Sequence, residues 1–554
     1  MCLGNMTNEN QVHAWVFRNN KESVSTRKLI DSLARLLDAG SSTGSGDVSA
    51  LIAAGELECA LADAADPVST FSAQLTDALA AATLDPRFAN RVNKVAILSQ
   101  IASVMRTTCA DSSPAEGFAY YALHPLQFAK AIGNPPSNAA AIIGIRSIGT
   151  VLSAVLAMAL ARRGCDSSRI TVRPQGHPYD RRTSFDEEQI RWIKARIEGE
   201  CDFFVVDEGP GLSGSSFLSV AEALEREGVP AERIALIGTR EPDPARLCAP
   251  DATRRWARFR FHCVPSKWTD EVHCTNWSGG VWRNALYLTE SSWPACWTQM
   301  ESLKFRSEDS SALSKFEGLG HFGDVARDRA RTIFAGGFGP KLLGVEEELS
   351  RYGFVPGALL TRSDVSSNVL EQIAKYCAFR ASAFPAAKAD FKAMSEMARF
   401  NCAQGVEAQI SEELLATRTP VIVDGRMHPH EWIRTLSGHI YKMDGNTHGD
   451  DHFFPGPVDI AWDLAGAIIE WELDSLAADF LVKCYRKFSG DDPTPRLRAY
   501  RMAYLAFRLG FCKMAEASVE NADEKARFRR NQVVYRRCLE DTLPPGAGPV
   551  ARAS

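Results

Sequence analysis

The sequence of 554 residues lacks several features that mark common classes of protein. It has no apolar run of about 18 residues, the length that a membrane-spanning helix needs, so no membrane span is expected. Its N-terminal residues lack the basic and apolar regions of a secretory signal peptide, which favours a cytoplasmic protein. Its 14 cysteines include no Cys-x-x-Cys pair, and this favours reduced thiols over disulfides or a zinc site.

An excess of positive charge is also missing. The formal net charge is −5, from 63 Lys and Arg against 68 Asp and Glu, so nucleic acid is not indicated as a partner. Hydrophobic residues make up 45% and charged residues 24% of the chain, which is typical of globular domains. The length predicts roughly three or four domains.

Residues 1–110 predict a helical N-terminal region without recognisable chemistry. Apolar residues recur at helical spacing over residues 25–39, 48–64 and 67–83. A stretch rich in Gly and Ser at residues 40–46 predicts a flexible loop between the first two helices. The region is expected to serve as a cap or as a partner surface, and the sequence does not decide between them.

Residues 111–265 alternate between predicted strands and helices, which is the pattern of a parallel sheet. The predicted core strands are apolar on both faces, and a last, alternating stretch predicts an edge strand. These strands are expected at Ala141–Ile145, Ile170–Arg173, Phe203–Val206, Ile234–Gly238 and Arg258–Val264.

Two adjacent acids, Asp207 and Glu208, follow one of these buried strands directly. A loop of small residues comes next, and residues 217–227 predict a helix after it. The N–H groups of such a loop and the positive end of the helix can hold a phosphate group. The carboxylates can accept hydrogen bonds from sugar hydroxyls or hold a metal ion. The pattern therefore predicts a sugar-phosphate site, and the alternative is an ordinary turn with two solvated acids.

The stretch resembles the phosphoribosyl-pyrophosphate (PRPP) motif of type I phosphoribosyltransferases. Asp207 and Glu208 match its acids, while the phosphate turn has Ser-Gly-Ser-Ser in place of Thr-Gly-Gly-Thr. The resemblance implies an enzyme that binds PRPP and Mg²⁺, with this acidic pair catalytic, and displaces pyrophosphate with an acceptor that the sequence does not identify. The phosphate-binding residues that it implies are Gly144, Arg146, Ser147, Gly149, Thr150, Arg173, Gly211, Ser213, Gly214, Ser215 and Ser216.

Two neighbouring connections add to this resemblance. The loop Gly144–Thr150 lies where the family keeps its pyrophosphate loop, and Arg146 there can add a charge-assisted contact. The next connection carries a cluster of cations, Arg173, His177, Arg181 and Arg182. They belong either to the site or to a solvated basic loop.

Residues 266–300 form a Trp-rich connector, which is expected to be packed, and residues 301–540 carry a second set of motifs. Their order resembles the aminoglycoside-phosphotransferase class of kinase-like folds. Lys315 matches the nucleotide-binding lysine of that class, and Asp444 matches its metal-binding Asp. Asp459 and Asp463, in Pro-Val-Asp-Ile-Ala-Trp-Asp-Leu-Ala, match its distal carboxylates, and Asp463 is expected to brace the catalytic loop.

The catalytic loop departs from the pattern of the class. Residues 424–431 put Arg426 where the base Asp belongs and Glu431 where the metal-binding Asn belongs. A guanidinium cannot accept a proton at neutral pH, so ordinary hydroxyl phosphorylation is not expected from this alignment. Asp424 is the candidate catalytic base if the loop is reshaped, and Glu431 is a candidate oxygen ligand for Mg²⁺. The inserted residues 448–452 offer a further acid and add to histidines that form no recognised zinc set.

The predicted fold class is therefore α/β. A helical N-terminal region precedes a parallel-sheet domain of phosphoribosyltransferase type, an α+β kinase-like domain follows, and residues 541–554 are expected to form a disordered tail. The first function hypothesis is a phosphoribosyltransferase-like enzyme fused to a unit that binds ATP or a related nucleotide with Mg²⁺. The alternative is a regulatory or defence-type protein that senses such ligands without turnover. For the kinase-like domain, an active kinase, a degenerate nucleotide-binding unit and a coincidence of pattern all stay open.

Overall fold

The computed structural model describes most of the chain. The described residues are 22–38, 44–88, 92–112, 115–133, 137–269, 274–402, 412–417, 419–448 and 456–542, with Ala14 and Ile410. The predicted loop residues 40–43, the acids and the histidine of residues 449–452, and residues 543–554 of the predicted tail lie outside this part.

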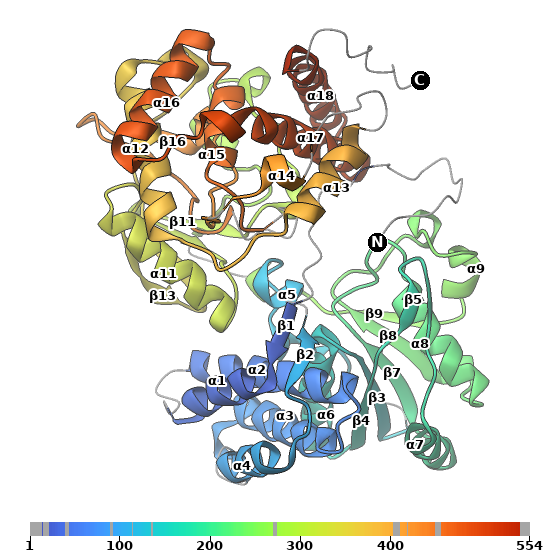
Figure 1. The fold of residues 1–554 in the computed structure, drawn as a ribbon. Coiled ribbons are helices and arrows are strands. Elements are labelled where there is room, and N and C mark those ends of the chain that lie inside the picture. Colours follow the sequence, from blue (N-terminus) through green and yellow to red (C-terminus); the bar gives the residue numbers. More distant parts are fainter. Residues whose placement is uncertain are drawn as a thin grey trace. The chain divides into compact units, whose positions relative to one another are not determined.

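The chain groups into two compact units (Figure 1). The α/β unit comprises Asn20–Val272 and Gly318–Asp324. The C-terminal unit comprises Met1–Asn19, His273–Glu317 and Val325–Ser554. The domain boundaries expected from the sequence stay predictions.

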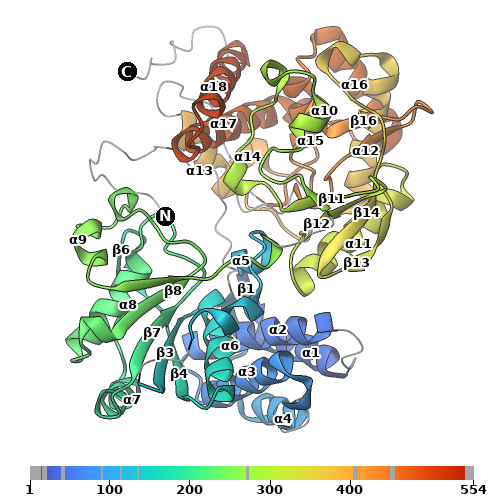
Figure 2. The same ribbon diagram turned by 180° about the vertical axis from the view of Figure 1, so that it is seen from behind.

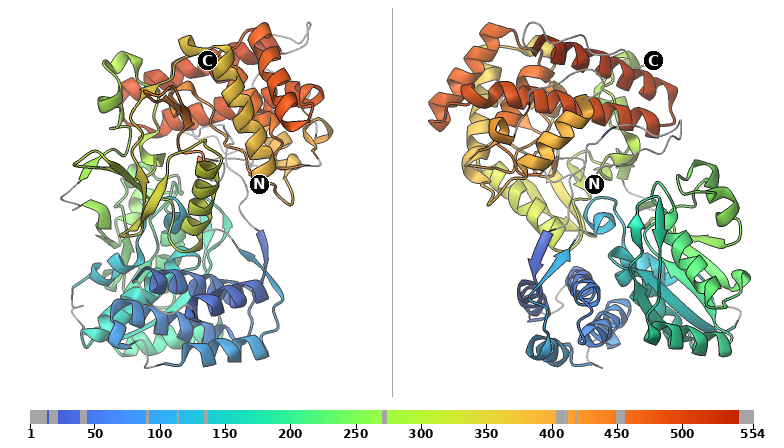
Figure 3. Two further views of the ribbon diagram at one scale, coloured as in Figure 1. Left: turned by 90° about the vertical axis from the view of Figure 1, so that its left-hand side faces the viewer. Right: turned by 45° about the vertical axis from the view of Figure 1, so that its right-hand side comes forward.

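The helical N-terminal region is confirmed, and it belongs to the α/β unit. Its helices α2 and α3 pack on α6 of the sheet domain, and they are drawn in blue in Figure 3. Arg169, in a strand of the sheet, is buried and bonds to Glu58 of α2 at 2.8 Å and to Asp77 of α3 at 2.5 Å. The elements are β1 (Glu22–Ser25), α1 (Thr26–Asp38), α2 (Gly44–Asp63), α3 (Ser69–Leu84), α4 (Lys94–Val104), β2 (Cys109–Ser112) and α5 (Glu116–Ala119).

A parallel sheet of five strands forms the core of the α/β unit, as the strand–helix alternation predicts. Its order is β4-β3-β7-β8-β9, and β9 lies at the edge as expected. The strands are β3 (Ala139–Ile145), β4 (Asp166–Val172), β7 (Asp202–Val206), β8 (Ile234–Gly238) and β9 (Arg260–Cys263). The helices are α6 (Ile148–Arg162), α7 (Glu187–Glu198), α8 (Ser215–Arg226) and α9 (Ala252–Trp256), and a hairpin joins β5 (Gln175–His177) to β6 (Asp180–Arg182).

This strand order has a topological switch point between β3 and β7. In open parallel sheets, ligands bind outside the carboxyl ends of the strands at such a point. All five residues of β7 are buried, because helices cover both faces of a parallel sheet. The first polar side chains after β7 therefore lie at the edge where a ligand is expected.

The C-terminal unit begins with an antiparallel sheet in the order β10-β11-β12-β14-β13 (Figure 2). Helix α11 (His321–Ala335) follows the third strand in sequence. Lys315 is the last residue of that strand. The strands are β10 (Cys274–Asn276), β11 (Lys304–Ser307), β12 (Ala312–Lys315), β13 (Leu342–Glu346) and β14 (Leu349–Gly353), and α10 (Arg283–Leu286) lies between the first two in sequence.

A smaller sheet and a group of helices complete this unit. Their apolar residues form one large core, in which every residue of α15 is buried. The sheet consists of β15 (Ala358–Leu359), β16 (Trp432–Arg434) and β17 (Ile440–Lys442). The helices are α12 (Ser367–Ala383), α13 (Phe391–Cys402), α14 (Glu412–Leu415), α15 (Ala461–Glu470), α16 (Ser475–Ser489), α17 (Thr494–Ser518) and α18 (Ala522–Thr542).

The Trp-rich connector contains buried side chains, with Trp268 in the α/β unit and Trp277 and Trp297 in the C-terminal unit. Among the described helices, none combines the length and the apolar character that crossing a membrane requires. The described cysteines are all free thiols.

Candidate functional site

A buried carboxylate braces residues 424–431 of the C-terminal unit, the predicted catalytic loop. Asp463 of α15 accepts hydrogen bonds from the backbone N–H groups of Asp424 at 2.8 Å and Gly425 at 2.9 Å. This is the contact that the sequence motif predicts. Burial, with the charge of Asp424 nearby, raises the pKa of Asp463 to about 6.

Asp424 is fully buried at the start of this loop. The hydroxyl of Tyr376 donates to its Oδ2 at 2.5 Å, and its Oδ1 lies 3.1 Å from Nδ1 of His448 and 3.3 Å from Nζ of Lys442. Burial alone would raise the pKa of Asp424, but Lys442, His448 and Arg380 hold it well below its usual value. Its role as a base stays a prediction, and its enclosure by three partners weighs against contact with a substrate.

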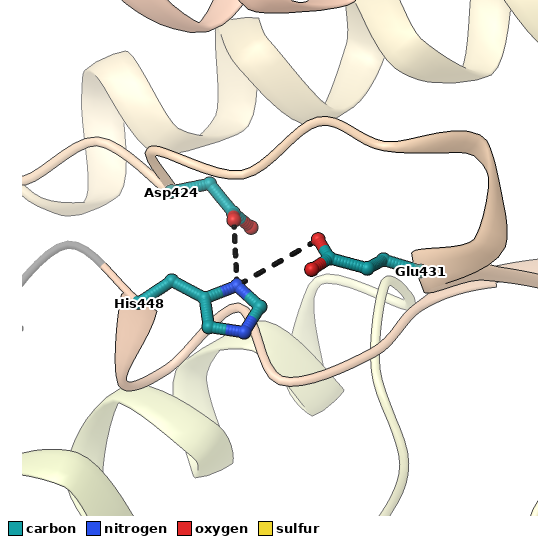
Figure 4. A group of neighbouring side chains, drawn as sticks. All are labelled: Asp424, Glu431 and His448. Atoms are coloured by element: carbon teal, nitrogen blue, oxygen red, sulfur yellow. Dashed lines mark hydrogen bonds and ion pairs between the residues drawn. The ribbon is translucent and has the colours of Figure 1, made fainter. Parts of the chain in front are cut away.

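Asp424, Glu431 and His448 form a cluster of potential metal ligands, whose ligand atoms lie within 4.8 Å of one another (Figure 4). Figure 4 shows Nδ1 of His448 directed toward both carboxylates, 3.8 Å from Oε2 of Glu431. Lys442 donates to the same Oε2 at 2.9 Å. These three residue types suit a divalent cation, but the ammonium group of Lys442 already lies between the carboxylates of Asp424 and Glu431.

Asp444 and Lys315, which the sequence links to metal and nucleotide, are brought together. Nζ of Lys315 lies 3.0 Å from Oδ1 of Asp444, and Nζ of Lys304 lies 3.5 Å from Oδ2. Lys315 also contacts Oε1 of Glu317 at 3.7 Å and donates to the hydroxyl of Thr447 at 3.0 Å. Burial would raise the pKa of Asp444, but the nearby lysines hold it well below its usual value.

The turn that carries Asp444 is fixed by the protein itself. Asp444 has a positive φ of 57°, a conformation that Asp tolerates better than most residues. A Cβ on Gly445 would lie 2.3 Å from the hydroxyl of Tyr376, so only glycine fits there. Asn446 donates from Nδ2 to Oε1 of Glu317 at 2.7 Å. The metal-type carboxylate is therefore presented by a rigid turn.

Sequence reasoning missed three residues of this site, Lys304, Glu317 and Lys442, and it noted His448 without linking it to Asp424 and Glu431. A single Lys or Glu between apolar residues carries no pattern, because its partner is set by the sheet register and not by neighbours in sequence. Arg426 stands at the position expected for the base, and its side chain is half-buried.

The α/β unit places Asp207 and Glu208 at the switch point, directly after β7. The loop after β3 reaches the same place, since a Cβ on Gly149 would lie 2.4 Å from the backbone oxygen of Val206. Burial raises the pKa of Asp207 to about 7, and burial together with the charge of Asp207 raises the pKa of Glu208 to about 8. Such shifts are common at functional sites, so the acidic pair stays a predicted ligand site.

The serines expected to cradle a phosphate are bonded within the protein. The hydroxyls of Ser213 and Ser215 both donate to the backbone oxygen of Pro178, at 2.8 and 2.7 Å. Gly214 begins α8 at a φ of 68°, and a Cβ there would meet Leu247 at 2.9 Å. Side chains therefore cover this face of the turn, whereas Gly211 and Ser216 lie nearer the surface.

The arginines expected to bind phosphate also bond to groups of the protein itself. Arg146 and Arg173 both bond to Asp63 of α2, Arg146 at 3.1 Å through Nη1 and Arg173 at 3.1 Å through Nε. In the pyrophosphate-type loop, the N–H of Ser147 donates to Sγ of Cys59 at 3.3 Å, and Oγ1 of Thr150 lies 2.9 Å from the same sulfur. Gly144 packs on α6, because a Cβ there would lie 2.4 Å from Oγ of Ser153.

A comparison with family models gave no match, and a comparison with curated proteins gave none either. Solved structures similar to part of the chain are kinases and phosphotransferases. A choline kinase from Streptococcus pneumoniae is 14% identical, and the match covers 42% of this chain and 89% of that one at a TM-score of 0.30. An ethanolamine kinase from Plasmodium vivax is 10% identical, with coverages of 44% and 81% and a TM-score of 0.31. An aminoglycoside phosphotransferase from Alicyclobacillus acidocaldarius is 11% identical, with coverages of 44% and 89% and a TM-score of 0.30.

These TM-scores are too low to establish a fold or an activity, so the proposal below rests on side-chain geometry. Nothing in the comparisons supports the prediction of a PRPP-dependent transferase. Of the side chains expected to hold phosphate, Ser213, Ser215, Arg146 and Arg173 bond to other parts of the protein.

Proposed function

We propose that the C-terminal unit is a kinase-like unit that binds a nucleoside triphosphate together with Mg²⁺. The observation that carries the proposal is the position of Lys315, at the end of the third strand of an antiparallel sheet, in contact with Glu317 and Asp444. In protein kinases, a lysine of the third strand contacts the phosphates and pairs with a glutamate, and a downstream aspartate holds Mg²⁺. The same three roles can be filled here by residues that touch one another.

The surroundings of Asp444 fit a hard cation. Its side chain is 30% exposed, and carboxylate oxygens are the ligands that Mg²⁺ prefers. When bound, Mg²⁺ supplies charge neutralisation between phosphate oxygens. Lys315 and Lys304 add two positive charges beside that carboxylate, which favours a polyanionic ligand. The brace from Asp463 holds the catalytic loop in register with this group.

The base position disfavours rapid transfer to a hydroxyl group. Arg426 cannot accept a proton at neutral pH, and the carboxylate of Asp424 is enclosed. We therefore propose tight nucleotide binding with slow or no transfer to a hydroxyl. A regulatory unit that senses nucleotide without turnover has the same site, and an assay for release of ADP separates the two.

Nucleotide-induced thermal stabilisation, measured with ATP and ADP in the presence and absence of Mg²⁺, tests the proposal. At a ligand concentration of about 100 times Kd, binding stabilises a protein by about 2.7 kcal/mol. Asp444→Ala should lose the Mg²⁺-dependent part of the shift, and Lys315→Met should lose most of the shift. Lys483→Met, an exposed lysine of α16, is the matched control and should keep it. No shift of the unaltered protein with any nucleotide would overturn the proposal.

A further inference from the structure

Lys442 places an ammonium group between the carboxylates of Asp424 and Glu431. Its Nζ lies 3.3 Å from Oδ1 of Asp424 and 2.9 Å from Oε2 of Glu431, and it donates to the backbone oxygen of Met443 at 2.9 Å. These carboxylates belong to the cluster drawn in Figure 4. In protein kinases, the residue at the position of Glu431 helps to hold a second metal ion.

We propose that the ammonium group of Lys442 replaces this second metal ion, so that the nucleotide site holds one divalent cation, at Asp444. The inference rests on the proposed function of the C-terminal unit. The net charge of this position agrees with the inference, because Glu431 stands where the class pattern has a neutral Asn. This exchange adds one negative charge, and Lys442 adds the positive charge that balances it.

The register of the small sheet holds the ammonium group in place. Lys442 is the last residue of β17, and its partner across the antiparallel pair is Trp432, the residue that follows Glu431. The N–H of Met443 donates to the backbone oxygen of Glu431 at 2.8 Å and extends the pairing by one bond. Backbone pairing, and not ligand binding, therefore brings the lysine beside the glutamate.

Burial separates the two cation positions. The side chains of Lys442 and Asp424 are both 0% exposed, whereas that of Asp444 is 30% exposed and that of Lys304 is 12% exposed. A cation from solvent can reach Asp444 while the nearby lysines move toward the phosphates. A cation between Asp424 and Glu431 would leave the ammonium of Lys442 enclosed without its carboxylate partners, which is strongly unfavourable.

Counting bound Mn²⁺ by electron paramagnetic resonance tests this inference, because Mn²⁺ prefers the same oxygen ligands as Mg²⁺. The full chain is titrated with Mn²⁺, with and without the non-hydrolysable ATP analogue AMP-PNP. The count is made on a chain with Asp207→Asn and Glu208→Gln, which removes the carboxylates of the α/β unit that could hold a further ion. We expect one bound Mn²⁺ per chain in the presence of the analogue, and two bound ions would overturn the inference.

Lys442→Met then removes the ammonium group and should raise the count by one. The matched control is Lys483→Met, which removes an exposed lysine of α16 and should leave the count unchanged. Equal counts for folded Lys442→Met and the unaltered protein would overturn the inference. The difference in bound Mn²⁺ between Lys442→Met and the unaltered protein is also measured without AMP-PNP. Absence of AMP-PNP binding with that difference intact would overturn the proposed function, and of the inference only the occupation of this cation position by Lys442 would then stand.

Discussion

Replacing Asp463 by Asn tests whether the buried brace sets the catalytic loop. The carboxylate accepts two backbone hydrogen bonds, at 2.8 and 2.9 Å, one with each oxygen. A carboxamide of the same shape keeps one acceptor oxygen, and its NH₂ group then faces the other backbone N–H. One hydrogen bond is therefore lost, and a buried donor is left without a partner.

The expected cost follows from these two changes. A hydrogen bond to a charged group contributes about 1.5–3 kcal/mol, and an unsatisfied buried donor costs about 1–3 kcal/mol. Loss of the repulsion between Asp463 and Asp424, which contributes to the raised pKa of Asp463, offsets part of this. We expect a net destabilisation of the C-terminal unit of about 2–3 kcal/mol for Asp463→Asn.

Hydrogen exchange followed by mass spectrometry resolves the effect by segment, which matters because the chain has two units. Peptides covering residues 421–431 should exchange faster in Asp463→Asn, while those of the α/β unit should not change. Asp474→Asn is the control, because Asp474 accepts a backbone hydrogen bond at 2.8 Å as the exposed N-cap of α16. Unchanged exchange in residues 421–431 of a folded Asp463→Asn protein would refute the bracing role.

Three further predictions concern both units. Gly149→Ala should destabilise the α/β unit by at least about 2 kcal/mol in denaturant unfolding, because the new Cβ would lie 2.4 Å from the backbone oxygen of Val206. Gly133→Ala is the control and should be nearly neutral, because no atom of the described residues, its chain neighbours aside, would lie within 4 Å of its new Cβ. Because the pKa values of Asp207 and Glu208 are raised to about 7 and about 8, the folded state binds more protons than the unfolded state, so the stability of the α/β unit should fall as pH rises from about 4 to 8. The double variant Asp207→Asn with Glu208→Gln should flatten this dependence in thermal unfolding at several pH values, and an unchanged slope would contradict these two acids as its source. Tyr376→Phe should cost about 1–3 kcal/mol, because it removes the hydroxyl that donates at 2.5 Å to the catalytic-loop carboxylate, and a melting temperature equal to that of the unaltered protein would argue against this bond.

Much of the fold follows from local patterns in the sequence. The strands around Ile143 and Val205 are predicted because both faces of a parallel sheet are covered, which selects an unbroken apolar run. The contact of Asp463 with residues 424 and 425 is long-range in sequence, and it was expected only because the stretch around Asp463 resembles the phosphotransferase class. The strands therefore follow from local patterns, and this contact follows from the resemblance.

The partners of long charged side chains do not follow from such patterns. Arg146 and Arg173 were expected to bind a phosphate, but both form ion pairs with Asp63. Asp63 lies more than 80 residues earlier in the sequence, so no local pattern predicts these pairs. The serines of the predicted phosphate turn bond to Pro178 for the same reason, since only the folded chain brings that carbonyl near. No sequence pattern marks Lys442, because its contact with Glu431 depends on the register of the antiparallel pair, which places Lys442 opposite Trp432.

The buried guanidinium of Arg169 has a consequence for where the chain can be divided. Its two carboxylate partners, Glu58 and Asp77, come from the N-terminal helices, whereas Arg169 itself belongs to the sheet. A fragment that begins at residue 111 would lose both carboxylates, and it would expose the guanidinium and the surface of α6 on which these helices pack. The N-terminal helices and the sheet should therefore unfold as one cooperative block, and a soluble fragment of the α/β unit has to retain both helices.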